Sequence, residues 1–216
     1  MPAPSASEIE NLAKGALQSA SLRGANAPDL AAALGQTCDK AFTLFVSMAM
    51  VAPGIPAAAP PPPGSGSTAS PGTLLPPPAG GPGASMLEPI ATGMLASNQL
   101  NGEKQGALAK AIAQSLEQAL MLFTTQVMVA PGMAIAGFTT TAPGSLMGAA
   151  PAKPMLQPIV LGFLQSGGIR GQNAPDLAGA IAEALSNTLT QMMTRLKVTP
   201  GIASTPAATA APGRLV

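Results

Sequence analysis

The chain has 216 residues, of which 47% are hydrophobic and 9% charged, and its ten basic and nine acidic residues leave a net charge of +1. Charge this sparse and evenly mixed attracts neither nucleic acid nor an anionic membrane, so we expect no partner of either kind. With no histidine and one cysteine, the chain has no intrachain disulfide framework and lacks the usual base of Ser-His and Cys-His catalysis. We therefore expect no enzyme and no catalytic, cofactor-binding or metal site.

The first residues, MPAPSASEIE, have neither a basic region nor an apolar run, so no signal peptide is predicted. The longest apolar runs, such as 41–53, are too short to span a bilayer. A soluble protein made in the cytoplasm is expected.

A nearly identical octapeptide occurs twice, as RGANAPDL at 23–30 and RGQNAPDL at 170–177. Residues 22–55 align with 169–202 without a gap, and 14 of the 34 positions are identical. The middle of the chain, 100–133, aligns at an offset of 78 residues. Self-similarity of this kind indicates three tandem repeats. We divide the chain at 1–76, 77–148 and 149–216, with the similarity itself covering about 7–76, 85–148 and 154–216.

Each repeat is predicted to begin with a short helix, at about 8–20, 87–97 and 156–165, because apolar residues recur there at helical spacing. Ser7 with Glu10, and Ser85 with Glu88, are spaced as capping boxes. Pro89 and Pro158 are expected in the first turn, where a proline leaves no backbone bond unmade.

Three aligned glycines, Gly15, Gly93 and Gly162, fall inside these short helices. A glycine there costs about 1 kcal/mol relative to alanine. Either another backbone approaches closely at these positions, or the glycines are simple weak points, and the sequence does not favour one reading.

The repeated octapeptide is interpreted as a turn followed by a helix start. Gly24, Gly102 and Gly171 suit a left-handed helix cap or an inter-helix turn. Asn26 or Ala27 then begins the next helix, with a proline in its first turn and Asp29 at the positive end of the helix dipole. A phosphate site formed by Arg-Gly and the helix start is conceivable, but the middle copy has Asn101 in place of the arginine and lacks NAPD, which favours the structural interpretation.

The second helix of each repeat is longer, at about 27–49, 103–127 and 174–196. Its apolar residues step by three and four, which predicts one buried stripe. Cys38 aligns with Leu116 and Leu185 and is expected to pack in the core rather than act as a nucleophile. The stripe residues are Leu30, Leu34, Cys38, Ala41, Phe45 and Met48, then Leu108, Ile112, Leu116, Ala119 and Phe123, then Leu177, Ile181, Leu185, Thr188, Met192 and Leu196.

Each long helix is followed by a tail rich in Pro, Gly, Ala and Thr, at 51–75, 129–147 and 198–216. Every tail has a Pro-Gly turn signal near its start and another near its end, so the segment between them forms either a short β-hairpin or an extended arm. A tail of this composition buries little surface by itself, and we expect it to become ordered on a neighbouring subunit.

One repeat is too small for a useful core, so the three must bury their stripes together. They either stack as a solenoid or close into a pseudo-threefold bundle like a fused trimer. We favour closure, in a mainly α chain of three tandem helical hairpins with extended tails.

Each repeat resembles small structural proteins of tailed bacteriophages, in which two helices lead into a short strand and an extended tail. The matching residues are VMVAPGMAIAGFTTTAPGS at 127–145 and LKVTPGIASTPAATAAPG at 196–213. The resemblance implies a minor virion protein of the head, neck or tail, present in several copies in a symmetric assembly and bound to other virion proteins through its arms. A phasin-like coat of amphipathic helices on a granule is the alternative, and a disordered linker protein is disfavoured by the regular stripes.

Overall fold

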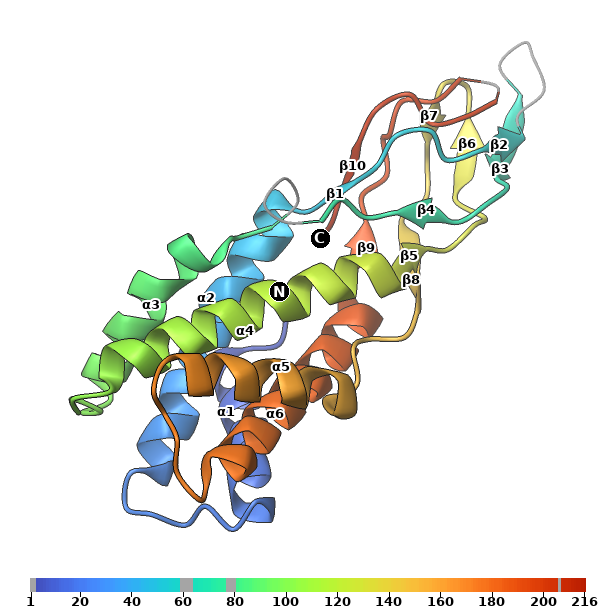
Figure 1. The fold of residues 1–216 in the computed structure, drawn as a ribbon. Coiled ribbons are helices and arrows are strands. Elements are labelled where there is room, and N and C mark those ends of the chain that lie inside the picture. The colour runs from blue at the N-terminus through green and yellow to red at the C-terminus, as the bar shows by residue number, and fades with distance from the viewer. Residues whose placement is uncertain (1–2, 59–63, 77–80, 206) are drawn as a thin grey trace.

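The computed structural model describes residues 3–58, 64–76, 81–205 and 207–216 (Figure 1). The chain is mainly α with several short antiparallel sheets, and this part of the expected fold class is confirmed. Short and long helices alternate along the chain. They are α1 (Ala6–Ser19), α2 (Ala27–Met48), α3 (Ala84–Ser97), α4 (Gln105–Gln126), α5 (Lys153–Ser166) and α6 (Ala174–Arg195).

The helices have matching lengths and begin at the offsets found in the sequence alignment. The short helices α1, α3 and α5 each have 14 residues, and the long helices α2, α4 and α6 each have 22. α3 begins 78 residues after α1, and α5 begins 147 residues after it. The short helices begin two or three residues earlier than expected, which changes how each is capped.

The capping boxes expected at Ser7 and Ser85 are wrong. Ser5 is the N-cap of α1: its hydroxyl accepts from the Glu8 backbone N–H at 3.4 Å, and the Ser5 N–H donates to the Glu8 carboxylate at 2.8 Å. Ser5 and Glu8 have the same spacing as Ser7 and Glu10, so the sequence pattern fits both pairs. The N-cap of α3 is Gly83, which makes no side-chain capping bond.

The first-turn positions expected for Pro89 and Pro158 are also wrong, because both prolines lie inside α3 and α5. Each removes one backbone donor within its helix. Both prolines are exposed, so water can reach the carbonyl oxygen that loses its partner. α5 carries a second proline, Pro154, in its first turn.

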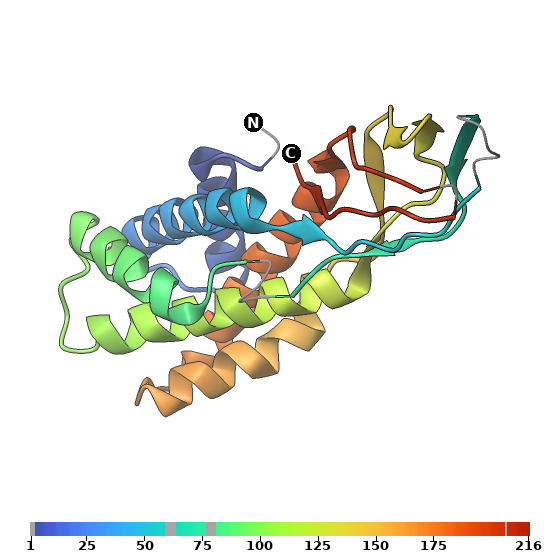
Figure 2. The same cartoon turned by 90° about the horizontal axis from the view of Figure 1, so that it is seen from above.

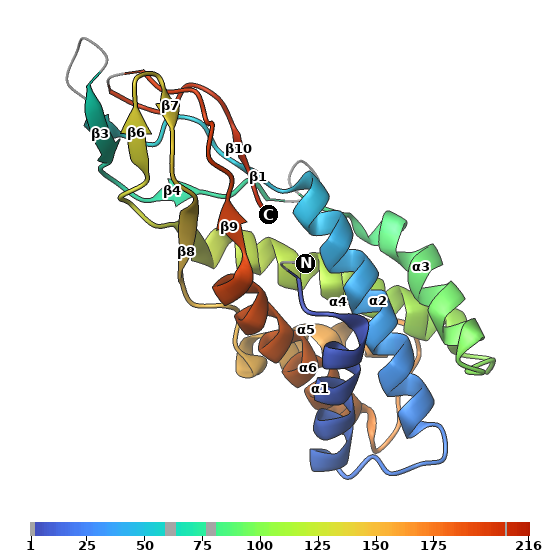
Figure 3. The same ribbon diagram turned by 180° about the vertical axis from the view of Figure 1, so that it is seen from behind.

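The six helices enclose one apolar core. Each helix contacts the next along the chain, and α6 also contacts α1, so the contacts form a closed cycle. Figures 2 and 3 show the helices grouped on one side of the molecule and the strands on the other. Phe45 of α2 and Phe123 of α4 meet edge to face, with ring centroids 6.0 Å apart. The stripes of the long helices are buried as predicted, apart from half-buried residues at their ends, Leu30, Met48, Leu108 and Leu177.

The aligned glycines of the short helices are not close-approach sites. A β-carbon at Gly15, Gly93 or Gly162 would meet nothing within 4 Å. Close approach occurs instead at Gly35 of α2, where a β-carbon would lie 2.7 Å from the Ala6 carbonyl oxygen and 2.9 Å from the Glu10 nitrogen. These are backbone atoms of α1, so Gly35 allows the two helices to pack tightly.

Two glycine substitutions should therefore have opposite effects. We expect Gly35→Ala to destabilise the fold by about 1–2 kcal/mol, because the cost of overpacking against backbone exceeds the gain in helix propensity. Gly93→Ala gains that propensity without a clash and should stabilise by about 0.5–1 kcal/mol. Urea unfolding followed by circular dichroism measures both changes, and a stabilising Gly35→Ala would contradict the packing described.

The tails form two tiers of strands. The tier nearer the helices, here called the inner ring, joins β10 to β1 and β4 to β5, β8 and β9. Single bridges between Val51 and Leu74 and between Val198 and Leu215 complete the cycle. Its strands are β1 (Met50–Val51), β4 (Gly72–Thr73), β5 (Val127–Val129), β8 (Gly144–Gly148), β9 (Lys197–Val198) and β10 (Gly213–Arg214).

The outer tier is here called the tip. It joins β2 (Ala57–Ala58), β3 (Ser65–Thr68), β6 (Ala134–Ala136) and β7 (Thr139–Thr140) in that order. Single bridges from Ala203 to Thr139 and from Ala208 to Pro56 connect the last tail to the same tier, and a third joins Ser204 to Thr209 within that tail.

Three buried threonines connect each tail to the next in a cyclic order. The Thr68 hydroxyl accepts from the Met133 N–H, that of Thr140 from the Ile202 N–H, and that of Thr209 from the Ile55 N–H, at 3.0, 3.0 and 2.9 Å. The third bond returns from the last tail to the first. Our expectation that the tails need a neighbouring subunit to become ordered is therefore wrong, because they supply each other's hydrogen-bond partners.

An ion pair connects the first and last helices. Arg195 of α6 donates two hydrogen bonds to Glu8 of α1, at 2.7 and 3.0 Å. These bonds, with those from Ser5, lower the pKa of Glu8 from 4.5 to about 2. Two different N–H groups of the guanidinium bind the two carboxylate oxygens, an arrangement that favours the ionised form.

A depressed pKa in the folded state makes the contribution of Glu8 depend on pH. The contribution is fully present above the unfolded pKa and disappears as the pH falls towards about 2. We expect wild type to melt at a higher temperature than Glu8→Gln near neutral pH, with the difference shrinking in acid. Glu103→Gln, in the turn between α3 and α4, is the control, and a difference independent of pH would contradict the assignment.

Candidate functional site

The three turns between short and long helices lie together at the end of the helices away from the strands. This region, residues 20–26, 98–104 and 167–173, is here called the turn end. Each short helix ends in the same way: the N–H groups of Leu22, Leu100 and Ile169 donate back to the carbonyls of Leu17, Leu95 and Leu164, at 2.9 Å in each case. This is the Schellman arrangement, which places an apolar residue against the last turn of its own helix.

The left-handed residues of these turns are not the expected glycines. Positive φ angles occur at Ser21 (59°), Gln99 (60°) and Gly168 (73°), three residues before Gly24, Gly102 and Gly171. Since each helix ends at residue 19, 97 or 166, the cap must follow at once. The expected glycines lie in the next turn, where their carbonyls accept from the residue that begins each long helix, at 2.9–3.0 Å.

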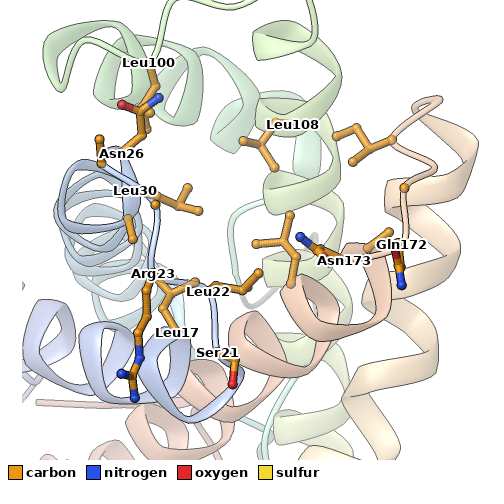
Figure 4. Close-up of a pocket in the computed structure, with 17 residues that line it drawn as sticks. Leu17, Ser21, Leu22, Arg23, Asn26, Leu30, Leu100, Leu108, Gln172 and Asn173 are labelled. Carbon is orange, nitrogen blue, oxygen red and sulfur yellow. The ribbon is translucent and has the colours of Figure 1, made fainter.

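A cavity of about 700 Å³ opens between the three turns (Figure 4). Figure 4 shows the side chains of Leu30 and Leu108 directed towards each other across it. Besides Leu17 and three alanines, the cavity is lined by six aliphatic residues that form three aligned pairs. Each pair has one residue from a turn and one from the start of the following long helix: Leu22 with Leu30, Leu100 with Leu108, and Ile169 with Leu177. All six are half-buried, so their exposed sides form the wall of the cavity.

Two further cavities adjoin the first. One of about 660 Å³ shares Leu100, Leu108, Ile169 and Leu177 with it, and one of about 480 Å³ shares Leu17 and Leu22. The turn end is therefore hollow across much of its width. Such a surface can receive an apolar group larger than one methyl or isopropyl group.

The cavity lining carries little charge. Arg23 is the one charged residue among the lining residues of the 700 Å³ cavity, and Figure 4 shows its side chain directed away from the interior. Ser21, Asn26, Gln172 and Asn173 supply polar groups along the rim. This arrangement is suited to binding an apolar group and provides no acid and base facing each other across the space.

The repeated octapeptide starts the long helices as predicted. α2 and α6 begin after Asn26 and Asn173, each with a proline in the first turn and an aspartate beside it. Neither asparagine makes a side-chain capping bond. The phosphate interpretation gains no support, because the cavity between the helix starts is lined mainly by aliphatic side chains.

Cys38 lies in the core, as predicted. Its side chain is 3% exposed, and the aligned Leu116 and Leu185 are buried as well. Burial, with a smaller effect of Asp39, raises the pKa of its thiol to about 12. The thiol is therefore protonated at neutral pH, which suits a packing residue.

We expect native Cys38 to resist thiol reagents such as a maleimide or an aromatic disulfide. A buried, protonated thiol is a poor nucleophile, so labelling should be more than about a hundredfold slower than in the chain unfolded with guanidinium. Mass spectrometry over time measures the rate, and comparable rates in the two states would contradict the burial.

Within the described ranges, no group of three or more Cys, Asp or Glu side chains is placed to hold a metal ion. Across the same residues, no helix has the length and hydropathy needed to cross a bilayer. The cavity itself was not predicted from the sequence. One sequence feature could have indicated it: Leu22, Leu100 and Ile169 occupy aligned positions, and each is an apolar residue beside a glycine-containing turn.

A scan of family models, a search of curated proteins and a search of solved structures each give no match to this chain.

Proposed function

We propose that the chain is a minor structural protein of a tailed bacteriophage virion, built as three fused copies of one unit around a pseudo-threefold axis. The cyclic order of the threonine bonds carries this proposal, since each tail binds the next and the last binds the first. One chain arranged in this way offers three similar faces. One copy of such a chain would fit a threefold position on a shell. Two copies together would supply the six units of a sixfold ring in a neck or tail.

We propose a mode of attachment other than the free arms expected from the sequence. Tails that are hydrogen-bonded within the chain are not free to lie as arms along a neighbour. The surfaces left for neighbouring virion proteins are the outside of the inner ring, the tip and the turn end. Support for the virion location itself comes from the resemblance of 127–145 and 196–213 to phage structural proteins.

The granule-coat alternative requires a continuous apolar face on the helices. The stripes of the long helices instead pack together in one core. Among the described residues, the exposed large apolar side chains come from different parts of the chain: Met86, Phe138, Met147, Met155 and Val216. We therefore retain the virion proposal alone.

Purified particles test the proposal. Phage particles from the producing bacterium, banded on a density gradient, should contain this chain at a fixed ratio to the major capsid protein by quantitative mass spectrometry. The copy number should fit threefold or sixfold positions. Absence of the chain from intact particles, together with its presence on lipid or polyester granules, would overturn the proposal in favour of a coat.

A further inference from the structure

Among the described residues, Phe138 is the most exposed of the large apolar side chains, with 63% of its surface accessible. It lies in the two-residue turn between β6 and β7, where Gly137 has a φ of 66°. A glycine at the first central position is typical of a tight β-hairpin turn. The Phe138 carbonyl accepts from the Ser204 N–H at 2.7 Å, so the backbone that presents this ring is held from two sides.

The tip around Phe138 carries no charge. The stretches 52–72, 130–144 and 198–213 contain no Asp, Glu, Lys or Arg. A surface of Ala, Thr, Ser, Gly and Pro with one exposed aromatic ring can be buried without removing water from an ionised group, which is the costly part of burying a polar surface. Aromatic residues are also the usual anchors of protein interfaces.

The turn end offers an apolar hollow for such a side chain. It holds an apolar cavity of about 700 Å³ whose lining includes one charged residue. Figures 1 and 2 show that the tip and the turn end lie at opposite ends of the molecule. The projection at one end carries no charge, and the cavity at the other has Arg23 as its one charged lining residue, so the two surfaces match in polarity.

We infer that the tip of one copy docks into the turn-end cavity of a second copy, with Phe138 as the anchor. Because the two surfaces differ and lie at opposite ends, this contact is heterologous and each added copy leaves one tip and one cavity free. Copies therefore stack end to end. Two turn ends placed face to face would instead leave their two hollows unfilled. The inference concerns self-association and holds wherever in an assembly the protein resides.

The oligomeric state of the purified full-length chain tests the inference. In sedimentation velocity from about 1 µM to about 0.5 mM, a range that covers weak association, the average mass should rise above the 21.1 kDa of one chain. Phe138→Ser removes the anchor, and Gly171→Trp fills the cavity from a position where a β-carbon meets nothing within 4 Å. Each variant should associate at least about tenfold more weakly. Met86→Ser, which removes an exposed side chain from α3, is the matched control and should behave as wild type.

Mixing the two variants separates end-to-end stacking from any face-to-face contact. Gly171→Trp retains a working tip and Phe138→Ser a working cavity, so the mixture should form one-to-one pairs and no longer species. A face-to-face contact cannot be restored in this way. Circular dichroism and melting temperature verify that each variant is folded. A wild-type chain that stays monomeric over the whole range overturns the inference, as does an effect of only one of the two variants.

Discussion

A chain that ends at residue 202 is expected to lose a large part of its stability, and its helices should unfold at a lower temperature. The deletion removes β10 and the buried Leu215, whose burial contributes about 2–3 kcal/mol. It also removes Thr209, whose hydroxyl and carbonyl accept from the backbone N–H groups of Ile55 and Gly54. Ile55 is buried, and a buried donor left unpaired costs about 1–3 kcal/mol, whereas the exposed Gly54 N–H can bond to water. Together these losses come to about 3–6 kcal/mol, a large part of the stability of a typical domain.

Thermal and urea unfolding followed at the helical signal measure this effect. Arg214→Ala, which shortens an exposed side chain and keeps the backbone of β10, is the control and should melt close to wild type. If the truncated chain kept the helical content and melting temperature of wild type, the tails would be independent arms and the closed inner ring would be wrong.

The second large effect is expected from Phe123→Ala. Phe123 is fully buried and packs edge to face on Phe45 of the neighbouring long helix. Truncating a buried phenylalanine leaves a cavity that its surroundings fill only partly and costs about 3–5 kcal/mol. In a protein of this size, the melting temperature should fall by roughly 6–20 °C.

Phe138→Ala is the matched control, because it makes the same chemical change at a side chain that is 63% exposed. Surface truncations of this kind usually change stability by less than about 0.5 kcal/mol. Measurements at low protein concentration keep self-association out of the comparison. Equal destabilisation by the two substitutions would show that the aromatic pair is not at the centre of the core.

The tails bind one another within the chain. Thr68, Thr140 and Thr209 each accept a hydrogen bond from a backbone N–H of another tail, and the last of these bonds returns from the third tail to the first.

The sequence by itself determined the number, type and order of the helices. Local signals decide these features: periodic apolar residues, and the Asn-Ala-Pro-Asp helix start that recurs before α2 and α6. Internal alignment also placed Cys38 in the core, because a position filled elsewhere by Leu116 and Leu185 has the same surroundings. The sequence did not determine where the first helix starts, because Ser5 with Glu8 and Ser7 with Glu10 both have the spacing of a capping box.

Only the tertiary structure decided how the tails, the turns and the close helix contacts are arranged. The tails have weak strand preference, and their hydrogen-bond partners lie as far apart in sequence as Ile55 and Thr209, so no local pattern reveals the pairing. The glycine that permits tight packing is Gly35 rather than the three aligned glycines of the short helices, because a neighbouring backbone and not the helix itself sets that requirement. The cavity at the turn end likewise depends on three turns meeting, and each turn alone contributes only a half-buried aliphatic side chain and the start of a helix.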